Sequence, residues 1–311
     1  MRVLWFGTYS VGPGYPRNTA LIGALRSVGV EVAECRVPLF EGPAQKIAAA
    51  TTARGALRFG ARAAAAWLRL AAGFLAAGPR DAVVVGYTGH LDLFLARALS
   101  TVCRRPLVLD AFLSPYDTIV GDRQLLRPGG AAAHLLYRFE RTSLHVADLV
   151  LTDTRAGAEY LTRTFGLPRR RCLPVPVGSL VRRAVRARRS VPVGGPGERR
   201  RPFTVLFVGS FVPLQGVPYI LDAAARAPDL RFRIVGDGPD GARIEEELRA
   251  RRMANVGLVR RFVPPSELEI FLGEADAVLG VFGTGPKAGR VVPCKVYDGL
   301  AAGLPVVTGD T

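Results

Sequence analysis

Short apolar runs alternate with longer segments of helical periodicity along most of the chain. The first run, Val3 to Gly7, is followed by a glycine-containing loop and a helix-like pattern from Thr19 to Val28. Further strand-like runs follow at residues 30–35, 82–86, 107–110, 148–153 and 172–178. Strands that alternate with helices predict a parallel sheet covered on both faces. The pattern therefore predicts a doubly wound, Rossmann-like α/β domain over residues 1–178.

The same pattern restarts at Thr204 to Val208. The turn GSFVPLQG, a helix to Ala227, a strand from Phe232 to Gly236 and a helix to Arg252 follow it. Between the two repeats, residues 182–201 hold eight arginines, one glutamate and the stretch VPVGGPG, which is typical of a linker. The 311 residues are about twice a common domain size. We therefore expect a linker over residues 179–202, a second Rossmann-like domain over residues 203–311, and a cleft between the domains.

The last stretch, residues 281–311, predicts a short helix entered from a loop. Pro293 suits a first helical position, and residues 295–302 can continue the helix. Gly303 suits a left-handed C-cap, and Pro305 prevents the helix from continuing beyond it. The helix is therefore expected to begin beside the basic loop that precedes it.

Three cations, Lys287, Arg290 and Lys295, lie in that loop and at the start of the helix. A helix N-terminus adds unpaired N–H groups and a partial positive charge, so the combination predicts an anion site. Asp298 lies one turn after Lys295, where a carboxylate beside bound phosphate is favourable only if it accepts hydrogen bonds from hydroxyls. A phosphate joined to a sugar meets both demands.

This stretch resembles the donor-binding segment of glycosyltransferase family 4, the retaining enzymes of the GT-B fold. In that family a Glu, seven residues and a second Glu precede a short apolar helix and then Gly-x-Pro-Val-Val. Here Asp298-Gly-Leu-Ala-Ala-Gly-Leu-Pro-Val-Val fits the second half, whereas Arg290 stands at the first acidic position. The chain is thus similar to a divergent branch, and the GT-B fold that it implies has two Rossmann-like, doubly wound parallel-sheet domains facing a cleft.

The first turn of the second domain also departs from the family pattern. Relatives carry an Arg and a Lys that grip the donor diphosphate, where this chain has Ser210 and Gln215. Neither brings charge, so we expect the cations of the final stretch to replace them. The resemblance implies donor contacts from Gly209, Ser210, Gln215, Gly216, Gly236, Asp237, Lys287, Arg290, Lys295, Val296 and Asp298.

The resemblance implies transfer of a hexosyl or related group from a nucleoside-diphosphate sugar to an acceptor hydroxyl. The transfer would retain the anomeric configuration and need no metal, and the nucleotide sugar would be a co-substrate with no further cofactor. Relatives usually continue past the last strand, so the chain resembles a form truncated at its C-terminus. A non-catalytic or vestigial nucleotide-sugar-binding protein is therefore an alternative.

A second alternative is an NADP-dependent oxidoreductase. Residues 236–241, GDGPDG, satisfy G-x-G-x-x-G between a strand and a helix. No carboxylate stands about twenty positions later to bind a ribose, but Arg260 and Arg261 could hold a 2′-phosphate. A lone motif of this kind is a weak signal, and the family has a similar turn at this place.

Candidate acceptor-side residues follow strands of the first domain. Asp110 and Asp117, with Asp122, lie in one loop after the strand at residues 107–110 and could hold an acceptor hydroxyl or a metal ion, or simply favour turns. We take the first two as catalytic candidates and assign no metal ligands. Gly12 and Gly14, in the loop after the first strand, are expected to line the cleft. The family commonly has a histidine where this chain has Asp110 and Ala111, and His90 is the one histidine placed to reach a cleft.

Residues 45–77 predict an amphipathic helix with basic residues and no acid. Four arginines, at positions 54, 58, 62 and 69, share one side, and the large apolar residues Leu57, Phe59, Trp67, Leu68, Leu70, Phe74 and Leu75 are assigned to the other. Such a helix can be an ordinary packed helix with solvated arginines. It can also lie on an anionic membrane surface and meet a lipid-linked acceptor.

Charge and cysteine content limit the remaining partners. The net charge is +16, but the arginine-rich segment has no aromatic residue or nucleic-acid-binding motif, which argues against nucleic acid. Four scattered cysteines predict neither a disulfide framework nor a metal cage and suit a reducing compartment. The N-terminal apolar run is too short for a signal peptide. We expect a cytoplasmic protein, with peripheral contact to the inner membrane face as an option.

Overall fold

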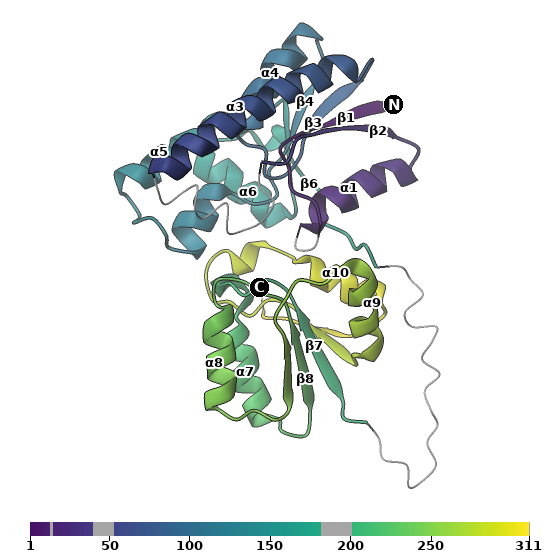
Figure 1. Ribbon diagram of the computed structural model, residues 1–311, viewed down its shortest axis with the longest axis vertical. Helices are drawn as coiled ribbons and strands as arrows, with labels where there is room; N and C mark the ends of the chain where they lie inside the picture. Colours follow the sequence, from purple (N-terminus) through teal and green to yellow (C-terminus); the bar gives the residue numbers. More distant parts are fainter. Residues whose placement is uncertain (13–14, 40–52, 182–200, 311) are drawn as a thin grey trace. The chain divides into compact units, whose positions relative to one another are not determined.

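The structure is a computed structural model that describes residues 1–12, 15–39, 53–181 and 201–310 (Figure 1). The chain divides into two compact units. The first comprises Met1–Val11, Arg17–Tyr116 and Gly129–Val175, and the second comprises Gly12–Pro16, Asp117–Pro128 and Pro176–Thr311. Most of the predicted linker, the first part of the predicted basic helix and Gly14 lie outside the described residues.

The sheet of the first unit has six parallel strands in the order β2-β1-β3-β4-β5-β6. The strands are β1 (Arg2–Gly7), β2 (Glu31–Arg36), β3 (Ala82–Val85), β4 (Leu107–Asp110), β5 (Leu149–Thr152) and β6 (Cys172–Pro174). Strand β1 pairs with β2 on one side and β3 on the other, so that Val3 lies beside both Val32 and Ala82. The order reverses between β1 and β3, which makes this the point where the sheet is doubly wound.

Helices cover both faces of this sheet. Alternate residues of β1 point to opposite faces: Trp5 packs with α1 (Pro16–Ser27), and Phe6 packs on the face covered by α3 (Ala53–Ala76) and α4 (Asp92–Val102). Helix α5 (Ala131–Val146) shares that second core, and α6 (Arg155–Phe165) packs beside β6 and α5. The central strands β1 and β3 are buried on both faces, which explains their nearly uninterrupted apolar sequence, whereas the edge strand β2 alternates buried and exposed residues.

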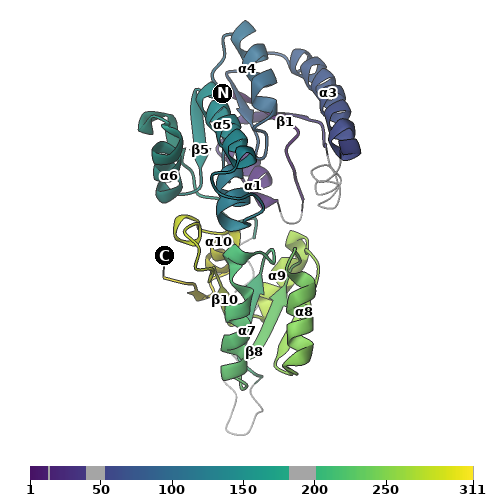
Figure 2. The ribbon, with the colours of Figure 1, turned by 90° about the vertical axis from the view of Figure 1, so that its left-hand side faces the viewer.

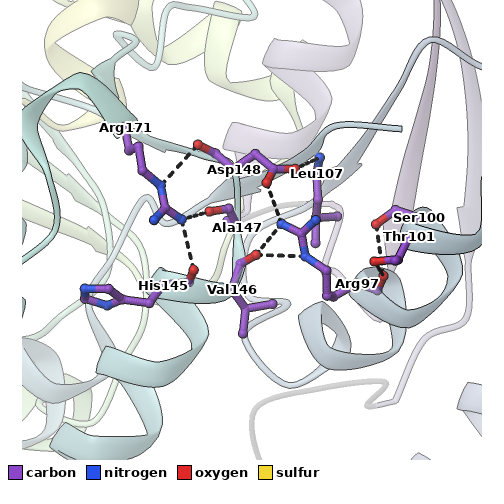
Figure 3. Close-up of polar contacts among 9 residues, drawn as sticks. All are labelled: Arg97, Ser100, Thr101, Leu107, His145, Val146, Ala147, Asp148 and Arg171. Carbon is purple, nitrogen blue, oxygen red and sulfur yellow. Dashed lines mark hydrogen bonds and ion pairs between the residues drawn. The ribbon is translucent and has the colours of Figure 1, made fainter. Parts of the chain in front are cut away.

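Two arginines fasten the C-terminal end of α5 to the amino end of β5 (Figure 3). Arg97 donates to the carbonyl of Val146 and to the Asp148 carboxylate, which also accepts a 2.7 Å hydrogen bond from the Leu107 N–H. Arg171 donates to the carbonyls of His145, Ala147 and Asp148. The last carbonyls of a helix lack intrahelical donors, so the two guanidinium groups satisfy acceptors that would otherwise need water.

The second unit has five parallel strands in the order β11-β10-β7-β8-β9. They are β7 (Thr204–Val208), β8 (Arg231–Val235), β9 (Val256–Val259), β10 (Ala277–Leu279) and β11 (Val306–Val307). Helices α7 (Val217–Arg226) and α8 (Gly241–Ala250) cover one face, and α9 (Pro265–Glu274) and α10 (Cys294–Ala301) cover the other (Figures 1 and 2). Short helical turns lie at Asp117–Asp122, Pro213–Gln215 and Ala288–Arg290.

The two predicted doubly wound parallel sheets are confirmed, and the differences lie at element ends. The strand expected over residues 172–178 ends at Pro174. Helix α10 begins at Cys294, so Pro293 is its N-cap and not its first helical residue. Gly303 follows the helix with φ of 72°, the left-handed conformation expected of it.

Candidate functional site

The point where the strand order reverses in the second sheet lies between β7 and β10. Open parallel sheets bind ligands outside the carboxyl ends of the strands at such a point. Three segments come together there in the second unit: the turn that follows β7, the loop that follows β10 and the first turn of α10. Two of the predicted donor residues, Gln215 and Lys295, meet at this place.

Lys295 is buried, and its ammonium group lies between neutral groups. Its Nζ donates a hydrogen bond to Oε1 of Gln215 and lies 3.6 Å from the centroid of the Phe207 ring. Burial lowers the pKa of Lys295 well below its usual value. Within the described part of the chain, no carboxylate forms an ion pair with it. A buried amine of this kind is poised to gain a bound anion, because an anionic ligand would offset the cost of its desolvation.

Backbone packing positions Gln215. Gly216 has φ of 67°, and a Cβ atom there would lie 2.4 Å from the carbonyl carbon of Phe282. The N–H of Phe282 donates to the Gln215 carbonyl at 3.2 Å. The turn after β7 therefore rests directly on the loop after β10, and only glycine permits this approach.

The G-x-G-x-x-G segment is explained by the same kind of packing. A Cβ atom on Gly236 would lie 1.9 Å from the Gly209 carbonyl oxygen, and one on Gly238 would lie 2.5 Å from the Phe211 carbonyl oxygen. Asp237 accepts hydrogen bonds from the Gly238 N–H and from Arg260. The glycines thus allow two turns of the protein to touch, which removes the reason to assign them to a dinucleotide.

The arginines of the oxidoreductase alternative are engaged elsewhere. Arg260 pairs with Asp237 and with Glu245, and Arg261 pairs with Glu267. These carboxylates already neutralise the cations that would have to hold a 2′-phosphate. The local geometry therefore does not favour NADP.

Asp298 faces the segment that enters the second unit after β6. Its carboxylate accepts a 2.6 Å hydrogen bond from the Ser179 hydroxyl and another from the Leu180 N–H. Burial raises the pKa of Asp298 to about 6, although these hydrogen bonds act in the opposite direction. Asp298 and Lys295 therefore lie on one helix with separate sets of partners, and Val296 lies between them in the sequence.

Lys287 and Arg290 contact a third set of residues, which belongs to the turn Asp117–Asp122 of the second unit. Arg290 pairs with Asp117 at 2.6 Å, and Lys287 donates to the Thr118 hydroxyl at 2.6 Å. Burial lowers the pKa of Lys287, whereas the nearby carboxylates raise it. The three predicted cations are thus divided between two environments, and among the described residues carboxylates act on Lys287 and Arg290 but not on Lys295.

Asp110, the other catalytic candidate, is fully buried at the end of β4. Arg17 contacts both of its carboxylate oxygens, with nitrogen–oxygen distances of 2.8 to 3.1 Å. Arg17 also donates to the Val175 carbonyl at 2.7 Å and lies over the Phe112 ring. Asp110 therefore neutralises a buried arginine, an arrangement that accounts for its position without substrate.

The expected loop of three carboxylates is not one cluster. Asp110 belongs to the first unit, and Asp117 and Asp122 belong to the second. Among the described residues, no three His, Cys, Asp or Glu side chains form a group that could hold a metal ion.

Sequence reasoning missed a polar group at the reversal point of the first sheet. The Thr8 N–H and hydroxyl both donate to Asp92, at 2.6 and 2.7 Å, and the Trp67 indole donates to the same carboxylate. His90, the histidine expected to reach a cleft, is buried, and burial lowers its pKa to about 4. Gly12 has φ of 108°, which fits a turn glycine. The sequence signal that could have indicated Asp92 is its position as an acidic residue at the start of the helix that follows β3.

Comparison with known families decides the class of the protein. Residues 8–178 match the model of the glycosyl transferase 4-like domain, and residues 202–311 match the model of glycosyl transferases group 1. The chain belongs to the glycosyltransferase 4-like family. The resemblance deduced from its final stretch is therefore confirmed, and the protein is a glycosyltransferase.

Solved structures show the same GT-B fold for this glycosyltransferase. Sucrose-phosphate synthase from Thermosynechococcus elongatus aligns with a TM-score of 0.66 at 17% identity, over 99% of this chain and 80% of the other. WaaG, a glycosyltransferase involved in lipopolysaccharide biosynthesis, gives a TM-score of 0.56 at 16% identity, over 99% and 80%. HepE from Anabaena in complex with UDP gives 0.55 at 15%, over 99% and 79%. No curated protein matches the sequence.

None of the described helices is both long and apolar enough to cross a bilayer.

Proposed function

We propose that this glycosyltransferase moves a sugar from a nucleoside-diphosphate sugar to an acceptor hydroxyl, with retention at the anomeric carbon and without a metal ion. The observation that carries the proposal is the buried Lys295 amine at the reversal point of the second sheet, held by Gln215. The family that this chain resembles carries an arginine and a lysine in the turn after β7. In this chain, Lys295 of α10 supplies the positive charge in their place. The structure of HepE with UDP supports a nucleoside diphosphate as the ligand class.

In this proposal Lys295 neutralises the diphosphate of the donor. The turn before α7, with the neutral Ser210 and Gln215, supplies hydrogen-bond donors to the same group. Gly216 and Gly236 let neighbouring turns pack in direct contact, and Gly209 lies against the Lys295 amine. The Lys295 amine is protonated when the ligand binds, because a bound diphosphate raises the pKa of a neighbouring ammonium group.

Lys287 and Arg290 act on the donor only if it competes with their present partners. Asp117 and Thr118 hold the two cations through contacts of 2.6 Å. A diphosphate carries more charge than one carboxylate, so exchange of partners is chemically reasonable. Asp298 is assigned to hydroxyl groups of the donor, because a buried carboxylate beside phosphate is stable only while it accepts hydrogen bonds.

The chemical step uses the donor itself as the base. The bond between the anomeric carbon and the diphosphate oxygen breaks, the acceptor oxygen bonds to the same face of that carbon, and the acceptor proton moves to the departing diphosphate. The two candidate catalytic carboxylates support this assignment, since Arg17 holds Asp110 and Arg290 holds Asp117. The protein then contributes positioning and charge stabilisation.

The acceptor is proposed to be a hydroxyl compound that can be linked to a lipid, and the protein to meet it at a membrane surface. WaaG, which shares the fold, takes part in lipopolysaccharide biosynthesis.

Slow hydrolysis of UDP- and GDP-sugars in the presence of EDTA tests the proposed chemistry, because water can replace the acceptor. We expect one nucleotide sugar to release its nucleoside diphosphate, and proton NMR to detect the sugar first in the anomeric configuration of the donor. Release that requires added Mg²⁺ or Mn²⁺ would overturn metal independence. Release of the opposite anomer would overturn retention.

A further inference from the structure

Helix α3 carries a line of leucines on its outer side. Leu57, Leu68 and Leu75 are 78, 75 and 72% exposed. Their spacings of eleven and seven residues place them within about 20° of one another around a helix of 100° per residue. The exposed alanines of the same side lie between them, at positions 61, 64 and 72. The result is an apolar stripe that runs along the helix and faces away from the core.

The core is on the opposite side of α3. Ala63, Ala66, Leu70 and Phe74 are buried against the first sheet. The sequence pattern placed every large apolar residue of this helix on one side, opposite the arginines, whereas the structure separates the three exposed leucines from the buried Leu70 and Phe74. The helix lies along the surface of the first unit (Figures 1 and 2), and its three outer leucines are exposed. A second apolar face therefore needs an explanation other than packing within the unit.

Cations flank the leucine stripe. Arg58, Arg62 and Arg69 are exposed and lie about 100° to 140° around the helix from the leucines. No Asp or Glu occurs anywhere between residues 42 and 80. Within the described residues, the three guanidinium groups have no carboxylate partner. The outer face of α3 is therefore apolar along its centre, basic on one side and free of acidic charge.

We propose that the outer face of α3, defined by these three leucines and three arginines, binds the surface of an anionic lipid bilayer. The leucines would enter the boundary between headgroups and acyl chains, and the arginines would pair with lipid phosphates and anionic headgroups. The helix is 24 residues long but does not meet the requirements of a membrane span, so it lies in the interface plane. A second copy of the chain is a poorer occupant, because two such faces would bring six arginines together.

The proposal deepens the function proposed above by naming where a lipid-linked acceptor would be met, and vesicle binding is measured without any sugar transfer. Failure of one can thus be distinguished from failure of the other. An acidic protein is the competing occupant of a basic face. An acidic protein would be attracted by the arginines, but its binding would not require that the leucines enter a lipid phase.

Cosedimentation of the full chain with vesicles tests the proposal. We use vesicles of phosphatidylcholine alone and of equal parts phosphatidylcholine and phosphatidylglycerol, at moderate salt. The expected result is binding to the anionic vesicles only. The variant L57S/L68S/L75S should bind at least roughly tenfold more weakly. The variant R58Q/R62Q/R69Q should lose on the order of a hundredfold.

Matched controls separate this face from the general positive charge of the protein. Leu135→Ser changes an exposed leucine of α5, and R155Q/R169Q/R170Q removes three exposed arginines of the same unit. Both are expected to bind like the unaltered protein. Equal losses in the control and test variants, or vesicle binding that survives in both test variants, would overturn the proposal. Binding of acidic polypeptides together with no vesicle binding would also overturn it.

Discussion

At the scale of single residues, the central feature is a lysine that is buried and that forms no ion pair with a carboxylate of the described residues. Lys295 reaches from the first turn of α10 to Gln215 and the Phe207 ring. Relatives resembled by the sequence place a lysine at the position of Gln215. In the proposed function, the amine of Lys295 takes the place of that lysine beside the same turn. The neutral amide of Gln215 avoids placing two cations together there.

At the residue scale, Asp298 makes the folding stability of the protein depend on pH. Its pKa of about 6 is above the value near 4 expected in the unfolded chain, so folding favours the protonated carboxyl. The favourable contribution is complete below about pH 4 and is lost as the pH rises through 6, by about 3 kcal/mol in total. Asp298→Asn cannot titrate, so its melting temperature relative to the unaltered protein should rise between pH 4 and pH 8.

Asp229→Asn, which changes an exposed carboxylate, is the control for that comparison. A constant difference for Asp298→Asn across this range would contradict the assigned burial of the carboxyl. Donor binding by Asp298→Asn, measured in the same samples, reports separately on the proposed contact with hydroxyl groups.

At the scale of elements, close contacts between turns hold the strand ends in position. We expect Gly236→Ala to lower the free energy of unfolding by about 2–4 kcal/mol, because the added Cβ would meet the Gly209 carbonyl and the backbone φ is 146°. Gly289→Ala is the matched control, since its Cβ would enter open space. Urea unfolding measures both. Equal midpoints for the two variants would show that the turns do not pack as described.

The arginine brace at the end of α5 is a second element-scale test. Arg171→Ala removes the donor to the carbonyls of His145 and Ala147, and we expect the free energy of unfolding to fall by about 1–3 kcal/mol (Figure 3). The neighbouring Arg170→Ala changes an exposed side chain and should have an effect below about 0.5 kcal/mol. Chemical denaturation of the two variants compares them directly. Similar losses would mean that the brace is not a source of stability.

At the scale of the whole molecule, the alternation of buried strands and helices predicted both sheets. Buried parallel strands are continuous apolar runs, so Val3 to Gly7 and Thr204 to Val208 could be placed within one residue of their observed ends. Glycine positions such as Gly216 were also predictable, because the turn after β7 has a recognisable pattern.

The direction of side chains was not predictable to the same extent. The partner of Arg290 is Asp117, 173 positions away, and nothing local in the sequence indicates that pairing. The sequence predicted an anion site at Lys295 but did not indicate that this side chain is buried against an aromatic ring. The outer leucines of α3 were placed on one side with the buried Leu70 and Phe74, because counting periods cannot distinguish one broad apolar face from two narrow ones. The family could be recognised from the sequence because its motif, Asp298 to Val307, is a contiguous stretch of the chain.

Calorimetric titration with UDP, GDP and NADP⁺ tests the central claim, that Lys295 holds the diphosphate of a nucleotide sugar. Unaltered protein and Lys295→Met are compared, because methionine retains the length of the side chain without its charge. We expect saturable binding of one nucleoside diphosphate to the unaltered protein and a loss of at least roughly tenfold in the variant. The variant should melt no lower than the unaltered protein, since it no longer buries an amine. Equal affinity in the two proteins, or binding of NADP⁺ alone, would contradict the account.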